Sequence, residues 1–240
     1  MGEPKIYLPE VGLHNNNLDS SIDRLEKSKT YRDLSTIIIC PTRGMIPARI
    51  VQSWMGLMRP MNQKVIGPLF ASGMEVGNAY NAMIELIINN PELSKWKYIL
   101  TIEEDNAPPA DGLLKLYESM DKYDVVQGLY WTKGEGGQPM IYGDPKVFPK
   151  NFIPQKPIVD AIMECNGLGM GFNLFKLDIF KNPELPKPWF RTVQEVVSGG
   201  ARAYTQDLYF FENASKLGYR YACDCRVKVG HYDFLNDMMW

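Results

Sequence analysis

A chain of 240 residues is long enough to bury a substantial hydrophobic core within one domain. With 45% hydrophobic and 22% charged residues, the composition is that of a folded globular protein and excludes a disordered one. The formal net charge of -2 provides no overall attraction for nucleic acid, so we expect no nucleic-acid partner.

The start of the chain carries no pattern for export. Residues 1–20 are polar and contain prolines, where a signal peptide would have a basic start and an apolar run. No stretch approaches the roughly 20 apolar residues that a membrane-spanning helix needs. The four cysteines lack the usual spacing of zinc ligands, and we expect them to be apolar strand residues in a reducing compartment. These features predict a cytoplasmic protein without a transmembrane segment.

The order of apolar and polar segments divides the chain. Residues 1–33 are polar and turn-rich and are predicted to form an N-terminal extension. A single domain at 34–240 follows, in two halves, 34–132 and 133–240. In the first half, strands are predicted at 35–40, 64–69, 98–102 and 124–131, with helices at 47–58, around 76–87 and after Pro108-Pro109. In the second half, short strands near 139–142, 158–165, 171–175 and 220–230 enclose a helix at 206–217.

This alternation predicts an α/β fold of Rossmann type. Buried strands that alternate with helices form a mostly parallel central sheet covered by helices on both faces. The second half adds a smaller mixed sheet. In open sheets of this kind, ligands bind beyond the carboxyl ends of the strands.

An acidic triplet, Glu103, Glu104 and Asp105, follows the strand predicted at 98–102. Three adjacent carboxylates repel one another unless a cation or hydrogen-bond donors offset the repulsion. Strand alternation would direct Glu103 and Asp105 to one side and Glu104 to the other. The triplet therefore indicates either a divalent metal site or simple capping of the next helix by carboxylates.

Six segments together resemble the GT-A fold of nucleotide-sugar-dependent glycosyltransferases. They are Ile-Ile-Cys-Pro-Thr-Arg at 38–43, Gly-Asn-Ala-Tyr-Asn at 77–81, the acidic stretch at 98–112, Asn-Gly-Leu-Gly-Met-Gly-Phe at 166–172, Thr-Gln-Asp at 205–207 and Gly-His at 230–231. The acidic triplet is similar to the family's DxD metal-binding motif, with Glu103 in place of the first aspartate. Tyr80 stands where an arginine is common. The chain is also similar to retaining members such as mannosylglycerate synthase.

The resemblance implies a role for each site residue. Asp105 and His231 would bind the metal, and Asp207 would be the catalytic carboxylate, either as a base or as a residue that positions the acceptor. Contacts to the nucleotide sugar would come from Pro41, Thr42, Arg43, Asn81, Glu103, Glu104 and Gly169. For single residues, purely structural alternatives remain open. Arg43 could form a surface ion pair, Asp207 could interact with the helix dipole, and the glycines of segment 166–172 could belong to a crowded strand.

The function implied is hexosyl transfer from a UDP-sugar, UDP-glucose by analogy, to an acceptor hydroxyl on a small molecule, glycan or lipid-linked sugar. An imidazole ligand favours Mn²⁺ over Mg²⁺ as the cofactor. One alternative is a sugar nucleotidyltransferase, although residues 40–45 hold only one glycine and one arginine for gripping phosphates. The other is a non-catalytic carbohydrate-binding module with the same fold.

Overall fold

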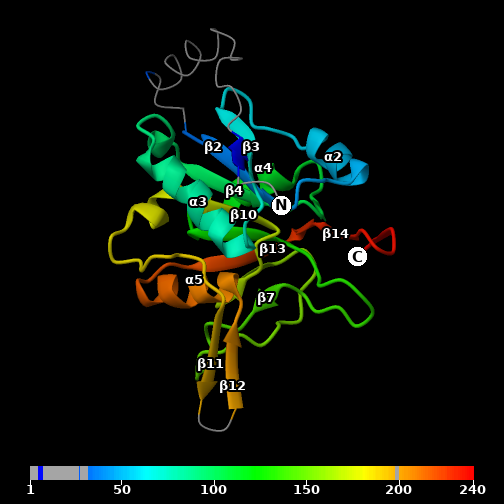
Figure 1. Ribbon diagram of the computed structural model, residues 1–240, viewed down its shortest axis with the longest axis vertical. Helices are drawn as coiled ribbons and strands as arrows, with labels where there is room; N and C mark the ends of the chain where they lie inside the picture. Colours follow the sequence, from blue (N-terminus) through cyan, green and yellow to red (C-terminus); the bar gives the residue numbers. More distant parts are fainter. Residues whose placement is uncertain (1–4, 8–26, 28–31, 198–199) are drawn as a thin grey trace.

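The computed structural model describes residues 5–7, 27, 32–197 and 200–240. Its centre is an eight-stranded sheet in the order β1-β3-β2-β4-β10-β6-β13-β8 (Figure 1). The sheet strands are β1 (Lys5–Tyr7), β2 (Thr36–Thr42), β3 (Val65–Ser72), β4 (Tyr98–Ile102), β6 (Val125–Leu129), β8 (Ile162–Cys165), β10 (Phe172–Lys176) and β13 (Tyr221–Lys228). The helices are α2 (Ala48–Met55), α3 (Val76–Asn89), α4 (Gly112–Ser119) and α5 (Gln206–Lys216), with 3-10 turns η2 (Leu93–Lys95) and η3 (Leu177–Lys181).

The strand directions confirm the predicted, mostly parallel sheet. Strands β3, β2, β4, β6 and β13 run in one direction, and β1, β10 and β8 run against them. The carboxyl ends of β2, β4 and β6 therefore meet at one edge of the sheet. This edge is where the predicted site residues of the first half should come together.

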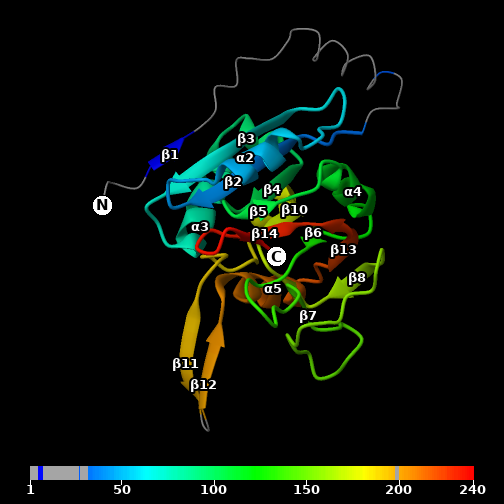
Figure 2. The same ribbon diagram turned by 90° about the vertical axis from the view of Figure 1, so that its right-hand side faces the viewer.

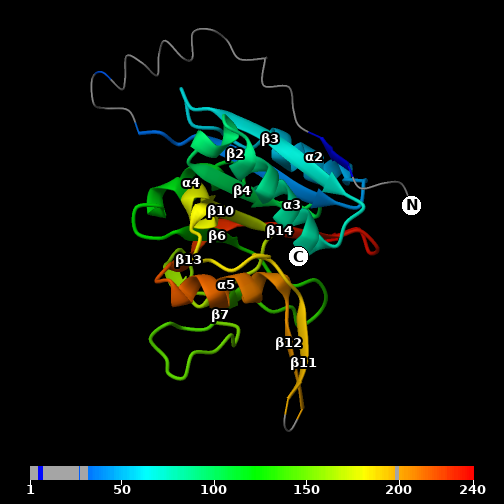
Figure 3. The same ribbon diagram turned by 60° about the vertical axis from the view of Figure 1, so that its left-hand side comes forward.

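The central strands are buried on both faces because their side chains alternate between two cores. In β2, Ile37 and Ile39 pack in the core that α3 and α5 cover, whereas Ile38 and Cys40 pack in the core under α4. Figure 3 shows α3 and α5 along the same side of the sheet. The four cysteines are buried and free, as apolar strand residues should be.

The second half contains elements that the sequence pattern did not predict. Strands β11 (Val193–Val197) and β12 (Gly200–Tyr204) form an antiparallel hairpin that projects from the rest of the molecule (Figures 1–3). The remaining short strands are β5 (Asn106–Ala107), β7 (Ile141–Tyr142), β9 (Gly167–Leu168), β14 (Gly230–Asp233) and β15 (Met238–Met239). Pairing of β5 with β14 brings the chain end beside the acidic triplet.

Some predicted boundaries were wrong. The strand expected from residue 158 begins only at Ile162, and the strand expected at 139–142 is reduced to two residues. Most of the predicted extension at 1–33 lies outside the described residues, and Lys5–Tyr7 adds an edge strand to β3. Within the part of the chain that is described, no helix combines the length and the apolar character needed to cross a bilayer.

Candidate functional site

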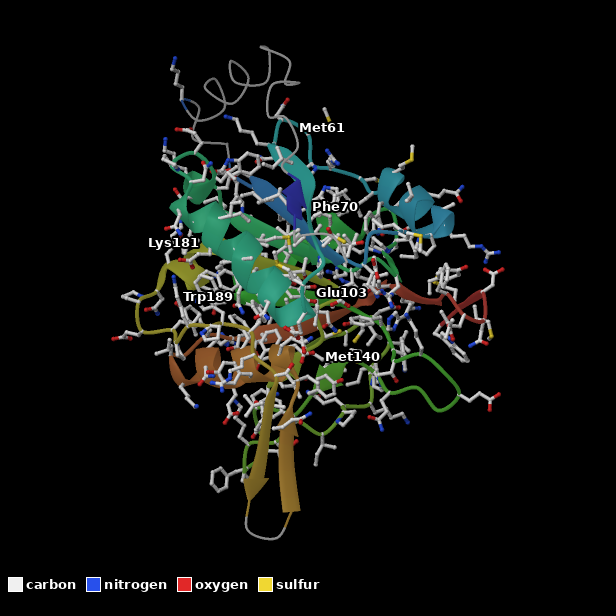
Figure 4. The ribbon with its side chains drawn as sticks, in the orientation of Figure 1. Met61, Phe70, Glu103, Met140, Lys181 and Trp189 are labelled. Carbon is white, nitrogen blue, oxygen red and sulfur yellow. The ribbon has the colours of Figure 1, made fainter. Side chains whose placement is uncertain are left out.

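A pocket of about 310 Å³ opens at the carboxyl ends of β2 and β4. Its lining residues are Pro41, Thr42, Arg43, Met74, Val76, Glu103, Glu104 and Asp105. Thr42 also borders a second pocket of about 300 Å³, which Gly44, Ile46, Phe70 and Ser72 complete. Figure 4 labels Glu103, which lines the first pocket, and Phe70, which lines the second. Predicted site residues from two separate strands therefore lie around one cavity.

Glu104 fixes the loop that begins at the end of β2. Its carboxylate accepts hydrogen bonds from the Thr42 hydroxyl at 2.7 Å and from the Arg43 backbone N–H at 2.8 Å. The Arg43 guanidinium forms an ion pair with the same carboxylate. Glu104 is buried, whereas most of the Arg43 side chain is exposed. The geometry gives Glu104 a structural role and leaves guanidinium N–H groups of Arg43 facing outward.

Glu103 lies in the pocket with an unusual acidity. It accepts a hydrogen bond of 3.1 Å from the hydroxyl of Tyr80, which α3 holds fully buried. Burial, followed by the nearby charge of Asp105, raises the pKa of Glu103 from 4.5 to about 7. Tyr80 is thus a hydrogen-bond donor to Glu103.

Asp105 and His231 are brought together by the pairing of β5 with β14. His231 lies opposite Asn106 in that pair, and the Tyr232 N–H donates to the Asp105 carbonyl at 2.7 Å. His231 Nε2 lies 3.6 Å from Asp105 Oδ2. His231 Nδ1 lies 2.7 Å from the carbonyl oxygen of Trp131, a contact that favours the proton on Nδ1. Nε2 then faces the Asp105 carboxylate, to which a protonated ring donates a hydrogen bond, whereas a neutral ring offers the Nε2 lone pair to a cation.

Lys133 completes this cluster and was not predicted. Its ammonium group lies 2.5 Å from Asp105 Oδ2. Burial favours the neutral form of Asp105, but hydrogen bonds and charges from His231 and Lys133 outweigh it and lower the pKa to about 2. Asp105 therefore carries its negative charge across the neutral pH range.

The residues fit a divalent cation as a partial ligand set. One carboxylate oxygen and one correctly oriented imidazole nitrogen suit Mn²⁺, and the Trp131 carbonyl is the outer hydrogen-bond partner typical of a metal-bound histidine. Beside them, the buried amide of Asn106 has no hydrogen-bond partner for either polar atom. No group of three His, Cys, Asp or Glu side chains that could hold a metal occurs in the described ranges. A bound ion would take its other ligands from substrate oxygens and water.

Asp207 lies in the first turn of α5 and is buried. Its carboxylate accepts a hydrogen bond of 2.9 Å from the Leu208 N–H, and burial raises its pKa. Its charge, in turn, raises the pKa of Glu103 and contributes after burial to raising that of Tyr142 to about 12. Asp207, from the second half of the chain, is thus close enough to Glu103 for their charges to interact.

Asn81 and Gly169, which were predicted to contact the nucleotide sugar, have partners within the protein. The Asn81 amide donates to the Phe190 carbonyl at 2.8 Å and accepts from the Phe190 N–H at 3.1 Å. Gly169 packs its α-carbon against the Tyr130 hydroxyl, and its carbonyl accepts a hydrogen bond of 2.6 Å from Asn173. Crowding explains this glycine, although it lies between β9 and β10 and not within a strand as predicted. A contact between either residue and a nucleotide sugar stays a prediction.

Sequence reasoning missed Lys133 and the role of Tyr80, although a signal for the lysine existed. Strands β4 and β6 point the same way, so residues just after each strand reach the same sheet edge. Lys133 follows β6 by four residues, as Asp105 follows β4 by three. No local pattern marks Tyr80, because its hydroxyl meets Glu103 only through tertiary packing.

Comparisons with known proteins identify the fold. No family model and no curated protein sequence matches the chain. The solved structure of A197 from STIV is similar over 85% of this chain and 92% of that one, at 18% identity and a TM-score of 0.60. The structure of GalNAc-T7 with UDP, GalNAc and Mn²⁺ is similar over 96% of this chain, which spans 59% of that one, at 9% identity and a TM-score of 0.54. The chain has the GT-A fold of glycosyltransferases.

Proposed function

We propose that this chain is a glycosyltransferase that uses a divalent cation and a nucleoside-diphosphate sugar. The observation that carries the proposal is the approach of His231 Nε2 to within 3.6 Å of Asp105 Oδ2, next to a pocket at the strand ends. A cation held there would act as a Lewis acid on the departing diphosphate. The GT-A fold and the Mn²⁺ and UDP bound to GalNAc-T7 support Mn²⁺ as cofactor, with Mg²⁺ as a substitute, and a UDP-sugar as donor.

The side chains around the pocket have distinct tasks in this proposal. Thr42 and Arg43 form the wall against which the nucleotide lies, held there by Glu104. The exposed guanidinium of Arg43 is a planar donor suited to phosphate oxygens. Glu103, tied to Tyr80, contributes a carboxyl on the sugar side that carries a proton in part of the population at neutral pH.

Asp207 is the catalytic carboxylate of the proposal. Burial raises its pKa, which strengthens it as a proton acceptor for an acceptor hydroxyl. In a retaining reaction, the same carboxylate would stabilise positive charge on the sugar ring. We expect retention, by analogy with family members that use a histidine ligand. The anomeric configuration of the product, measured by NMR, distinguishes the two outcomes.

Release of the nucleoside diphosphate tests the proposal. The protein is incubated with Mn²⁺ and a panel of nucleotide sugars, UDP-glucose among them, with and without simple acceptors. We expect diphosphate release that requires Mn²⁺ and falls at least roughly 100-fold in Asp105→Ala. Asp111→Ala is the control, since this partly exposed aspartate pairs with Lys115 at the start of α4.

Each other result has a definite meaning. Pyrophosphate chemistry would indicate a sugar nucleotidyltransferase, and no turnover with any donor would favour a carbohydrate-binding module. If Asp105→Ala kept normal activity that depends on Mn²⁺, the assignment of the metal site would be wrong.

A further inference from the structure

The surface around α2 exposes large apolar side chains. Met45 and Met55 have 78% and 83% of their surface exposed, and Val51 and Met58 are also exposed. We call these four residues the α2 face. On its other side the helix is anchored, because Ile50 is fully buried and the Trp54 indole donates to the Asn106 carbonyl at 2.9 Å. Several large apolar side chains exposed on one surface are typical of an interaction site, so the α2 face suggests an apolar contact outside the chain.

Positive charge accompanies these apolar residues. From residue 34 to residue 74 the sequence has no Asp or Glu, although an even spread of the chain's 28 acidic residues would place about five there. The same stretch carries Arg43, Arg49, Arg59 and Lys64. The arginines are exposed, and Met61, at 87% exposure, follows in the connection to β3 (Figure 4). In a chain with a net charge of -2, this stretch is positive along the sequence, although Glu104 pairs with Arg43 and Asp237 with Arg49.

The end of the chain extends the apolar surface. Phe234 and Leu235 are exposed in the turn after β14, Leu235 to 89%. Arg49 on α2 lies 3.7 Å from Asp237 in the same turn, which ties the turn to the helix. Figures 1 and 2 show α2 and this end of the chain on one side of the molecule. Asp233 ends β14 and Asp237 lies in the turn, and Arg49 offsets the charge of Asp237.

We infer that the α2 face docks onto the surface of an anionic lipid bilayer. Methionine, phenylalanine and leucine side chains that project singly can enter the boundary between headgroups and acyl chains. Arg49 and Arg59 beside them meet the negative headgroups, and the absence of acidic residues over 41 positions matches an extended negative surface better than a single anionic side chain. The docking is peripheral, and the described residues contain no helix that could span the bilayer.

The position of this face relates it to the pocket. Gly44 and Ile46, which line the second hollow, flank Met45 in the sequence. A bilayer against Met45 would therefore lie next to the loop that Glu104 fixes beside the pocket at the ends of β2 and β4. The docking itself does not depend on the proposed function, because it rests on apolar exposure and charge.

Vesicle flotation tests the inference with the full chain. We expect binding to vesicles of phosphatidylcholine with 30% phosphatidylglycerol, little binding to phosphatidylcholine alone, and weaker binding at high salt. Met45→Glu/Met55→Glu should weaken the partition at least roughly tenfold, because two charges replace inserted side chains. Arg49→Gln/Arg59→Gln should weaken it to a similar extent through lost headgroup attraction.

The matched control adds charge at exposed apolar positions elsewhere. Phe148→Glu/Val159→Glu changes two residues of similar exposure, 95% and 76%, in the connection between β7 and β8, and should bind vesicles as the unchanged protein does. Circular dichroism and thermal melts confirm that each variant is folded. The inference is overturned if the unchanged protein does not float with anionic vesicles, or if the control loses as much binding as Met45→Glu/Met55→Glu. It is also overturned if light scattering shows a dimer that Met45→Glu/Met55→Glu converts to monomer, because the face would then join two copies.

Discussion

Lys133 and a divalent cation would compete for the same carboxylate. The ammonium group lies 2.5 Å from Asp105 Oδ2, the oxygen that His231 also faces. A metal ion that binds this oxygen must displace the lysine or share the carboxylate with it. In the absence of metal, the lysine offsets the charge of Asp105 and favours its ionised form.

Replacing this lysine by a neutral residue of similar length should strengthen metal binding. We expect Lys133→Met to bind Mn²⁺ several-fold more tightly in the presence of UDP, because the ammonium group that competes for Asp105 is removed. The gain is limited to several-fold because solvent partly screens this ion pair. Electron paramagnetic resonance of free Mn²⁺ measures the affinity. Lys115→Met, which removes a surface ion pair with Asp111, is the control and should leave it unchanged. An affinity that stays equal or falls in Lys133→Met would refute the competition.

Glu103 makes stability depend on pH near neutrality. Its pKa is about 7 in the folded chain, against an ordinary value of 4.5, so the folded state holds the proton more tightly. The free energy of unfolding therefore falls as the pH rises between these two values. Glu103→Gln keeps an acceptor for Tyr80 and cannot ionise, and it should remove this decline. Urea unfolding with EDTA at about pH 5 and about pH 8 measures it, and equal declines in both proteins would contradict the assignment.

At the residue scale, the sequence marked the acidic triplet as a candidate site, because adjacent carboxylates at the end of a buried strand need a cation or hydrogen-bond donors to offset their repulsion. It did not predict how the three acids divide their tasks. Tyr80, Arg43 and Lys133 partner Glu103, Glu104 and Asp105, respectively, and each pairing joins segments far apart in the chain. Such pairings depend on tertiary packing, which single-residue chemistry does not contain.

Among the elements, the segment that includes β9 and leads into β10 depends on glycine. A Cβ atom built on Gly171 would lie 2.5 Å from Asn106 Oδ1 and 2.8 Å from a ring carbon of Tyr130. Both neighbours are buried, so neither has room to move aside. This segment therefore packs against the strand that carries Asn106, beside the candidate metal ligands.

Gly171→Ala should cost about 1–3 kcal/mol of unfolding free energy, because the added methyl group overpacks this contact. Gly56→Ala is the matched control. The Cβ atom of this second alanine would have no neighbour closer than 3.4 Å, and its backbone is in the ordinary helical region. Urea unfolding compares the two variants. Equal stability of both would show that the packing at Gly171 tolerates a side chain.

Helices and buried strands of the first half were predicted well because each has a strong period and a clear stop. Asn89-Asn90-Pro91 ends α3, and Pro41 closes the long apolar run of β2. The hairpin of β11 and β12 was missed. Its sequence mixes β-branched residues with Gln, Glu and Arg, and its strands pair with each other away from the cores. Strands that do not pack on a core need no regular alternation of apolar and polar residues, so the sequence carries no periodic signal for this hairpin.

For the whole molecule, the order of strands and helices was sufficient to predict the mostly parallel sheet. It also predicted the sheet edge where the candidate pocket opens. The approach of His231 to Asp105 joins residues 126 positions apart, and it depends on the pairing of β5 with β14. Only the resemblance to the GT-A fold suggested it in advance. A two-residue strand such as β5 is too short for any sequence period to reveal.

Direct measurement of Mn²⁺ binding tests the central claim, that Asp105 and His231 together hold a divalent cation at this sheet edge. Isothermal titration of the protein with Mn²⁺ in the presence of UDP should show one site. Asp105→Ala and His231→Ala should each weaken it by roughly tenfold to 100-fold or more, and Asp111→Ala should not. Binding of unchanged affinity in both Asp105→Ala and His231→Ala would contradict the account.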